Sequence, residues 1–337
     1  MKFLVTGGAG FIGSNFIHYL LKKYPDCQVA NLDKLTYCGT LTSLKDIEND
    51  PRYQFVKGDI CDFNLVDGLV KEFQPDYIVN FAAESHNSWA ILNPTVFFQT
   101  NVIGTQTLLE AARKNKTPRF HHISTCEVYG DLALDSQEKF REDSPYKPNT
   151  PYNASKAAAD LAVRAYFRTF NLPITISNCS NNYGPAQFPE KLIPLFVTNL
   201  LDDKKVPLYK SSQNRREWLH VLDHCQAIDL ILKKGKIGQT YNVGSRIEKS
   251  VEEITEIILK ELHQPATMKK YVQDRPSHDR RYLLDSSKIM KELDWQPEIP
   301  FEQGMRQTVQ WYKENRSWWE PLKEKVAVQE DQWKTKH

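Results

Sequence analysis

The sequence predicts an α/β protein: a Rossmann-type, doubly wound parallel sheet with a smaller α+β domain beside it. Two observations support this fold class. Strand-like and helix-like segments alternate through the first half of the chain, and a glycine-rich loop joins the first strand to the first helix. We expect the Rossmann domain over residues 1–180, with 220–245 returning to it, and the smaller domain over 181–337.

Composition limits the function classes. The chain has 337 residues and a net charge of +2, so no basic footprint for nucleic acid is expected. A helix needs about 20 apolar residues to span a bilayer, and no apolar run in this sequence is close to that length. The N-terminus does not have the pattern of a signal peptide. Six scattered cysteines form no C-x-x-C pair. We therefore expect no metal site, no disulfide framework, no membrane partner and a cytoplasmic location.

The first strand and helix enclose the glycine loop. Lys2–Thr6 reads as a buried strand, and a helical pattern runs to Leu21. Glycines permit a tight turn and let the backbone and helix N-terminus approach a pyrophosphate. The candidate residues of this loop are Gly7, Gly10, Phe11, Ile12 and Gly13.

The second strand supplies an acid. Gln28–Leu32 leads to Asp33, about 20 residues beyond the last glycine, where a carboxylate binds the adenosine ribose diol. Such an acid repels the 2′-phosphate of NADP, so we expect NAD as the cofactor. Lys34, directly beside it, weakens this preference for NAD over NADP.

Further elements follow at regular intervals. Strands are expected over Gln54–Lys57, Tyr77–Phe81 and Arg119–Ser124, with helices ending near Phe73 and crossing Thr100–Ala112. Loop residues after these strands are candidates to flank the adenine or line the cofactor, although ordinary loop roles are as well supported: Asp59, Ile60, Ala82 and Ala83. The second half predicts helices over His220–Lys233, Ser250–Leu262 and Phe301–Tyr312, and a strand over Gln239–Val243.

Tyr152 and Lys156 carry the candidate chemistry. Four residues apart in an alanine-rich helix, they share one face, and an ammonium beside a phenol lowers the phenol pKa. Tyr152 is then a plausible base for a sugar or alcohol hydroxyl. Thr125 and Glu127 follow the end of a strand, where ligands bind in open α/β sheets.

Motifs in one order give the chain a family resemblance. TGGAGFIG, GDI, FAAESH, S-T-x-E-V-Y-G, Y-x-x-S-K, NCSNNYGP, REWLHV and DRPSHDRRY span nearly its whole length. The chain resembles the nucleotide-sugar 4,6-dehydratases of the extended short-chain dehydrogenase/reductase superfamily, closest to the dTDP-glucose group. The resemblance implies that Tyr152, with Lys156 and Thr125, deprotonates the sugar 4-hydroxyl while NAD takes hydride from carbon 4. Glu127 would then remove the carbon 5 proton as the carbon 6 hydroxyl leaves.

The resemblance also implies a nucleotide-sugar clamp and a homodimer. Arginine suits diphosphate because its planar fork can bind two oxygens. The helices of Tyr152 and Thr100–Ala112 would pair in a four-helix bundle. The implied substrate-binding residues are Ser85, His86, Asn181, Lys191, Leu192, Arg216, Arg275 and His278.

Two departures from the family pattern bear on the product. Cys126 stands where the family has an aspartate that protonates the leaving hydroxyl, and a thiol is a weaker proton donor. Asn87-Ser88-Trp89-Ala90 replaces Val-Asp-Arg-Ser. We favour a 5,6-dehydratase that returns hydride to carbon 4 and forms a 5,6-ene from UDP-GlcNAc. The alternative is a conventional 4,6-dehydratase that forms a 4-keto-6-deoxy sugar from a UDP- or dTDP-sugar.

Three further interpretations stay open. A nucleotide-sugar 4-epimerase shares the glycine loop and Y-x-x-x-K but needs no carbon 5 base, so Glu127 argues for elimination. Cys126 as a covalent nucleophile would need a lowered pKa. A non-enzymatic NAD-dependent regulator should have lost Tyr152 or Lys156, and both are present.

Overall fold

The structure, a computed structural model, describes residues 1–326; residues 327–337 of the expected second domain lie outside this range. Seven strands form one sheet in the order β10-β6-β5-β4-β1-β2-β3, and every neighbouring pair is parallel. The predicted fold class is confirmed. The strands are β1 (Lys2–Thr6), β2 (Gln28–Asp33), β3 (Tyr53–Lys57), β4 (Tyr77–Asn80), β5 (Arg119–Thr125), β6 (Ile174–Cys179) and β10 (Thr240–Val243).

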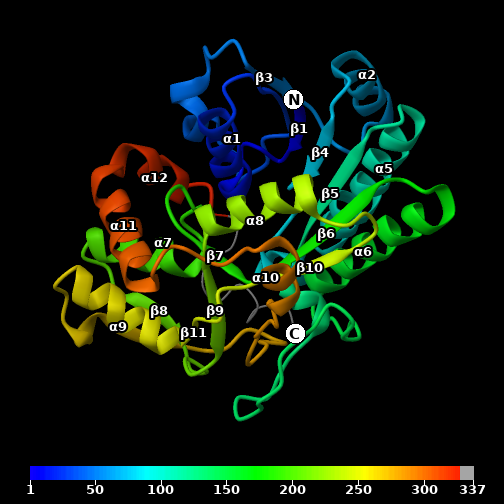
Figure 1. Ribbon diagram of the computed structural model, residues 1–337. Helices are drawn as coiled ribbons and strands as arrows, with labels where there is room; N and C mark the ends of the chain where they lie inside the picture. Colours follow the sequence, from blue (N-terminus) through cyan, green and yellow to red (C-terminus); the bar gives the residue numbers. More distant parts are fainter. Residues whose placement is uncertain (327–337) are drawn as a thin grey trace.

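Helices cover both faces of this sheet (Figure 1). Alternate side chains of β1 enter different cores: Phe3 packs with Phe16 and Val221 on one face, and Leu4 with Leu108 on the other. The first face carries α1 (Phe11–Lys23) and α8 (Val221–Lys234), which contact one another. The second carries α2 (Phe63–Phe73), α5 (Thr105–Lys114) and α6 (Pro151–Phe170).

The helix expected across Thr100–Ala112 is interrupted. A short α4 (Pro94–Phe98) runs into a π-helical turn, η2 (Gln99–Gly104), before α5 begins. Such π turns are often found at functional sites. Another short helix, α3 (Asn87–Leu92), precedes α4 and contacts α6. The described chain also has the 3-10 segments η1 (Leu41–Ile47), η3 (Cys126–Tyr129) and η4 (Ala266–Met268).

The second region has its own small sheets and core. One sheet joins β7 (Asn181–Tyr183), β9 (Arg215–His220) and β11 (Glu248–Ser250), and the other pairs β8 (Val206–Tyr209) with β12 (Lys269–Val272). Its helices are α7 (Leu192–Leu201), α9 (Val251–Glu261), α11 (Phe301–Glu314) and α12 (Arg316–Lys323).

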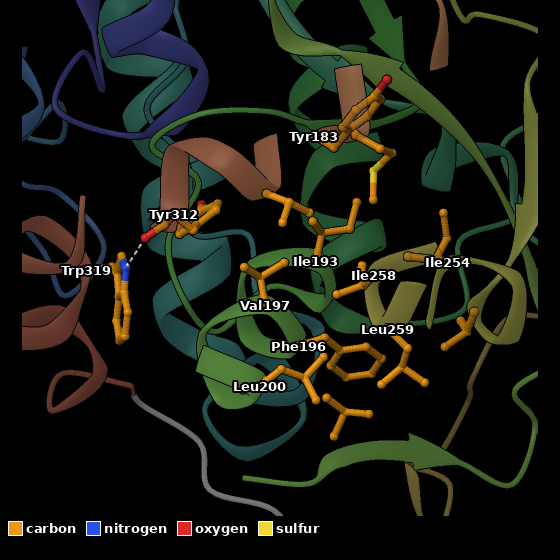
Figure 2. Packing of buried hydrophobic residues seen from close by; sticks show 14 of the residues in the cluster. Tyr183, Ile193, Phe196, Val197, Leu200, Ile254, Ile258, Leu259, Tyr312 and Trp319 are labelled. Carbon is orange, nitrogen blue, oxygen red and sulfur yellow. Dashed lines mark hydrogen bonds between the residues drawn. The ribbon is translucent and has the colours of Figure 1, made fainter. Parts of the chain in front are cut away.

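Figure 2 shows the core between these helices, where Phe196 and Val197 of α7 meet Ile258 of α9. Trp319 of the same cluster is fully buried, and its indole Nε1 donates to the Tyr312 carbonyl at 2.8 Å. Its role is therefore packing.

Two elements from the second half of the chain lie with the large sheet: β10 is one of its strands, and α8 packs on one face of it. α8 and β10 match the helix and strand predicted there, and β10 pairs with β6 in parallel. The short α10 (Ser287–Leu293) packs against β10. Over residues 1–326, none of the helices has the length and apolar character needed to cross a bilayer.

Candidate active site

A cavity opens at the carboxyl ends of the parallel strands, where the strand order reverses between β1 and β4. This is the position at which open α/β sheets bind their ligands. The cavity has a volume of about 300 Å³, and its walls come from the loops after β1, β2, β3 and β4, the end of β5, helix α6 and the start of the second region.

The glycine loop forms one wall of the cavity. Gly7 has φ +71°, and a Cβ there would lie 2.6 Å from the Ala82 backbone nitrogen, so only glycine fits. Helix α1 begins at Phe11 without a side-chain cap, and its first turn lines the cavity. Its free backbone N–H groups suit the pyrophosphate of a dinucleotide.

Asp33 lies at the end of β2 and is buried. Its carboxylate accepts the backbone N–H groups of Ala9 at 2.9 Å and Leu35 at 2.8 Å. Burial raises the Asp33 pKa, and these two bonds oppose the rise. Lys34 forms an ion pair of 2.6 Å with Asp59, so its ammonium is already engaged. Because Lys34 is paired with Asp59, it weakens the expected preference for NAD over NADP less than the sequence suggested.

All the predicted cofactor residues line this one cavity: Gly7, Gly10, Phe11, Ile12, Gly13, Asp33, Lys34, Asp59, Ile60, Ala82, Ala83, Tyr152 and Lys156. They come from five separate segments that the sheet brings to one edge. The cradle therefore fits a dinucleotide in shape and in the placement of its acid.

The environment of Tyr152 differs from the sequence-based expectation. Burial raises its pKa well above the ordinary value, with Glu127 adding to the rise and a hydrogen bond from Thr125 opposing it. Lys156 Nζ donates instead to the Ile123 carbonyl at 2.7 Å and lies 3.3 Å from His122 Nε2. Burial lowers the Lys156 pKa to about 8. The expected lowering of the Tyr152 pKa by this ammonium was wrong for the chain alone, because desolvation dominates both groups.

Glu127 sits on η3, next to Thr125 and Tyr152 at the cavity. Thr125 caps η3, and its Oγ1 accepts the Glu127 N–H at 3.2 Å. Burial raises the Glu127 pKa, and a hydrogen bond from Asn87 Nδ2 at 2.8 Å lowers it. A carboxylate base, a phenol and a hydroxyl thus share one wall.

Cys126 lies behind that wall. It is 1% exposed and packs with Val128, Ala157 and Tyr282, whereas Thr125 and Glu127 line the cavity. Burial raises the Cys126 pKa well above the ordinary value, and Glu127 adds to the rise. A covalent nucleophile needs the opposite shift, so this environment speaks against that interpretation.

The predicted substrate residues divide into two groups. Ser85, Asn181 and Lys191 line the cavity, and Lys191 Nζ donates to the Ser85 carbonyl at 3.0 Å. Among the described residues, Asn181 Oδ1 is buried without a hydrogen-bond partner. Outside the cavity lining are His86, Leu192, Arg216, Arg275 and His278.

The second group is held by the protein itself. His86 caps α3 by accepting the Trp89 N–H, and Leu192 begins α7. Arg216 donates to the backbone carbonyls of Arg215, Asp279 and Arg280 and stacks over Tyr282.

Arg275 and Arg216 still act on the site electrostatically. Both lower the pKa of His278, which burial depresses to about 3, and both lower the pKa of Glu127. The two arginines therefore lie near the Glu127 end of the cavity without lining it. Arg275 Nε is buried and has no partner within residues 1–326.

Sequence reasoning missed several residues at the site. Glu84 and Glu190 are buried at the cavity. Burial raises the pKa of both carboxyl groups, and the Glu190 charge raises that of Glu84 further. Glu84 lies in the quoted motif FAAESH and Glu190 directly precedes Lys191, but neither was a candidate residue. Asn87 was noted only as a departure from the family, and no periodicity pointed to its contact with Glu127.

Metal ligation finds no support in the described range: residues 1–326 contain no group of three or more His, Cys, Asp or Glu side chains placed to hold an ion.

Comparisons with known proteins agree with this geometry. The family model described as GDP-mannose 4,6 dehydratase matches residues 4–308. The dTDP-glucose 4,6-dehydratase of Haemophilus influenzae is 48% identical, over 94% of this chain and 99% of the relative. The chain belongs to the nucleotide-sugar 4,6-dehydratase family. It is therefore an enzyme, a nucleotide-sugar dehydratase.

Solved structures of this family match the fold closely. The dTDP-glucose 4,6-dehydratase DesIV of Streptomyces venezuelae, solved with NAD bound, has a TM-score of 0.92 and 49% identity, covering 96% of this chain and 100% of its own. The Bacillus anthracis dTDP-glucose 4,6-dehydratase, in complex with NAD, has a TM-score of 0.90 and 49% identity, covering 96% and 99%.

Proposed function

We propose that this dehydratase binds NAD and converts a nucleotide sugar such as dTDP-glucose to its 4-keto-6-deoxy product. The observation that carries the proposal is the meeting of Tyr152, Thr125 and Glu127 on one wall of the cavity that holds the glycine loop and Asp33. An oxidation needs the phenol base, and an elimination needs the carboxylate. Because a 4-epimerase needs no carbon 5 base, Glu127 favours the dehydratase.

In this proposal each residue has the role that the family resemblance implies. Tyr152 accepts the proton of the sugar 4-hydroxyl, and Thr125 orients that hydroxyl through its own hydrogen bonds. Lys156, on the same helix as Tyr152 and also at the cavity, supports this proton transfer as a nearby cation. Glu127 accepts the carbon 5 proton, which the new ketone at carbon 4 acidifies. Bound NAD would serve as the hydride acceptor for carbon 4 and later as the hydride donor to carbon 6.

We favour dTDP-glucose over the UDP-GlcNAc of the sequence-based interpretation. The named relatives at 48–49% identity are dTDP-glucose 4,6-dehydratases. In our proposal, Asn181 and Lys191 bind the diphosphate and nucleobase, with Ser85 and His86 supporting the sugar. Leu192, Arg216, Arg275 and His278 complete the clamp from the second region.

Cys126 favours a second candidate, the 5,6-dehydratase. Its thiol is buried and its pKa is raised, so it is a poor donor to the leaving hydroxyl at carbon 6. Return of hydride to carbon 4 would then leave a 5,6-ene, with UDP-GlcNAc as the substrate.

A proton NMR time course tests both candidates. The enzyme with NAD is given dTDP-glucose, UDP-glucose and UDP-GlcNAc separately. A new methyl doublet, with the carbon 4 ketone or its hydrate, supports the 4,6-dehydratase. Two vinylic signals at carbon 6 with an intact carbinol at carbon 4 support the 5,6-dehydratase instead. The absence of any turned-over sugar would contradict both.

The Cys126→Asp variant tests whether this residue controls the product. An acid there donates a proton more readily, so we expect any product mixture to move toward the 4-keto-6-deoxy sugar. Cys126→Ser, which keeps a small neutral side chain, is the matched control. A product ratio that is the same in all three proteins would exclude Cys126 as the determinant.

We also propose a homodimer and a cytoplasmic location. Leu161 of α6 and Ile103 of η2 are 58% and 46% exposed, so apolar side chains stand on the two helices expected to pair. All six cysteines are free thiols, which suits a reducing compartment. Light scattering should give twice the chain mass, and Leu161→Glu should reduce it to one chain.

A further inference from the structure

Asn87 connects Glu127 to the helix that carries Tyr152. Its amide nitrogen donates to Glu127 Oε2 at 2.8 Å, and its amide oxygen accepts the Thr150 hydroxyl at 2.6 Å. Thr150 is the N-cap of α6, and its oxygen accepts the Asn153 N–H at 3.2 Å. A single side chain therefore joins η3, α3 and the first turn of α6.

The surrounding bonds determine which way the Asn87 amide faces. The Thr150 hydroxyl can donate to the amide oxygen, whereas an ionised Glu127 carboxylate can only accept a hydrogen bond. The amide nitrogen is then directed to Glu127. A flipped amide would place its oxygen against the carboxylate, with no proton between the two atoms.

We propose that Asn87 is a positioning residue for the elimination step: it orients the Glu127 carboxylate toward carbon 5 and fixes it relative to Tyr152. The inference rests on the proposed role of Glu127 as the base. In that step the carboxylate takes the carbon 5 proton and becomes a carboxylic acid. The C–H electron pair passes into the ketone at carbon 4, which becomes an enolate.

Other groups around Glu127 define what Asn87 contributes. Burial is the largest influence and raises the Glu127 pKa; Asp279 also raises it, while Arg275 and Arg216 lower it. The Asn87 hydrogen bond is the largest influence that lowers the pKa.

Four further titratable groups face this carboxyl. The Glu127 charge raises the pKa of each of them: Tyr152, Cys126, Tyr282 and Cys179. The amide of Asn87 is consequently a donor whose protons do not titrate. It favours an ionised Glu127 without adding a charge of its own.

The role predicts an effect on one step of the reaction. Oxidation at carbon 4 depends on Tyr152, whereas exchange of the carbon 5 proton depends on Glu127. Losing a hydrogen bond to a charged group raises the Glu127 pKa, so the acidic limb of the elimination rate should move upward by about one pH unit. Glu127 must be ionised to act as the base. The elimination rate therefore falls as the pH drops below the Glu127 pKa and recovers as the pH rises through it.

The experiment compares Asn87→Ala and Asn87→Asp with the wild-type enzyme. NADH absorbance follows oxidation, and deuterium uptake from solvent follows carbon 5. We expect Asn87→Ala to keep the oxidation rate within about twofold and to slow carbon 5 exchange about tenfold at neutral pH. Asn87→Asp keeps the shape and the Thr150 bond but places a second carboxylate beside Glu127, so its acidic limb should move further.

Asn115→Ala is the matched control. Asn115 Nδ2 also donates to a carboxylate at 2.8 Å, that of Asp67, but neither residue lines the cavity. Its pH profile should equal that of the wild type. Equal losses of oxidation and exchange in both Asn87 variants, with an unmoved acidic limb, would reduce Asn87 to a structural residue. A wild-type enzyme that oxidises none of the three nucleotide sugars would instead overturn the proposed function.

Discussion

Sequence motifs predicted the cavity-lining residues of the first half more completely than those of the second region. In the first half, every predicted cofactor residue lines the cavity, from Gly7 to Lys156. In the second region, Asn181 and Lys191 line it, but Arg216 is bonded to three backbone carbonyls of its own chain. The motifs matched in both halves, yet only some of the polar groups predicted in the second region line the cavity.

The reason lies in the range of the contacts. A glycine turn, a helix N-terminus and an i,i+4 pair are fixed by a few neighbouring residues, so short motifs predict them well. A clamp made from β9 and the loop before Tyr282 depends on how distant segments pack. The following predictions test this contrast, from the largest expected effect to the smallest.

Tyr152→Phe should break the chemistry of the first half. Removing the phenolic hydroxyl removes the base for carbon 4 oxidation, so turnover should fall by about a thousandfold or more. NAD affinity should change little, because the ring still packs against Phe97. Stopped-flow NADH absorbance measures the loss. The control is Tyr146→Phe, at a partly buried tyrosine outside the cavity lining whose hydroxyl donates to Asp160. A variant with near wild-type oxidation would remove Tyr152 from the mechanism.

Asp33→Ala should weaken the dinucleotide site by a smaller amount. The carboxylate organises Ala9 and Leu35 and is placed for the ribose diol, so NAD affinity should fall about 10- to 100-fold. Discrimination against NADP should shrink as well. Calorimetric titration with each cofactor measures both effects. Asp50→Ala removes a carboxylate of the same half that pairs with Arg52 outside the cavity, and its affinities should stay unchanged.

Arg275→Met and Arg216→Met should separate the two arginines of the second region. Arg275 has a buried Nε without a partner in the described chain, so its loss should raise KM about tenfold with little change in Tm. Arg216 holds three carbonyls and a ring, so its loss should lower Tm by several degrees. Thermal denaturation beside steady-state kinetics distinguishes them. The reverse pattern would show that Arg216 is the direct phosphate ligand.

Lys34→Met should have the smallest effect. Its ion pair with Asp59 is largely exposed, and such pairs contribute little to stability. NAD affinity should change by less than about threefold, and any NADP binding should weaken because a cation near the ribose is lost. Lys45→Met, which breaks the exposed pair with Glu48, is the matched control. A large loss of NAD affinity would mean that Lys34 contacts the cofactor itself.

The sequence by itself determined the doubly wound sheet, the strand and helix positions around it, and the family. Gly7, Asp33 and the Tyr152–Lys156 pair could be assigned because their geometry is local and their spacing is diagnostic. Alternating strands and helices likewise required no knowledge of distant contacts.

Only the tertiary structure decided the charges and partners inside the site. Lys156 faces the Ile123 carbonyl and His122, so burial governs the Tyr152 pKa, contrary to the expectation from helical spacing. Asn87 reaches Glu127 across 40 residues of sequence. Both facts depend on which side chains pack together and how much water they exclude, and neither quantity can be read from spacing along a single chain.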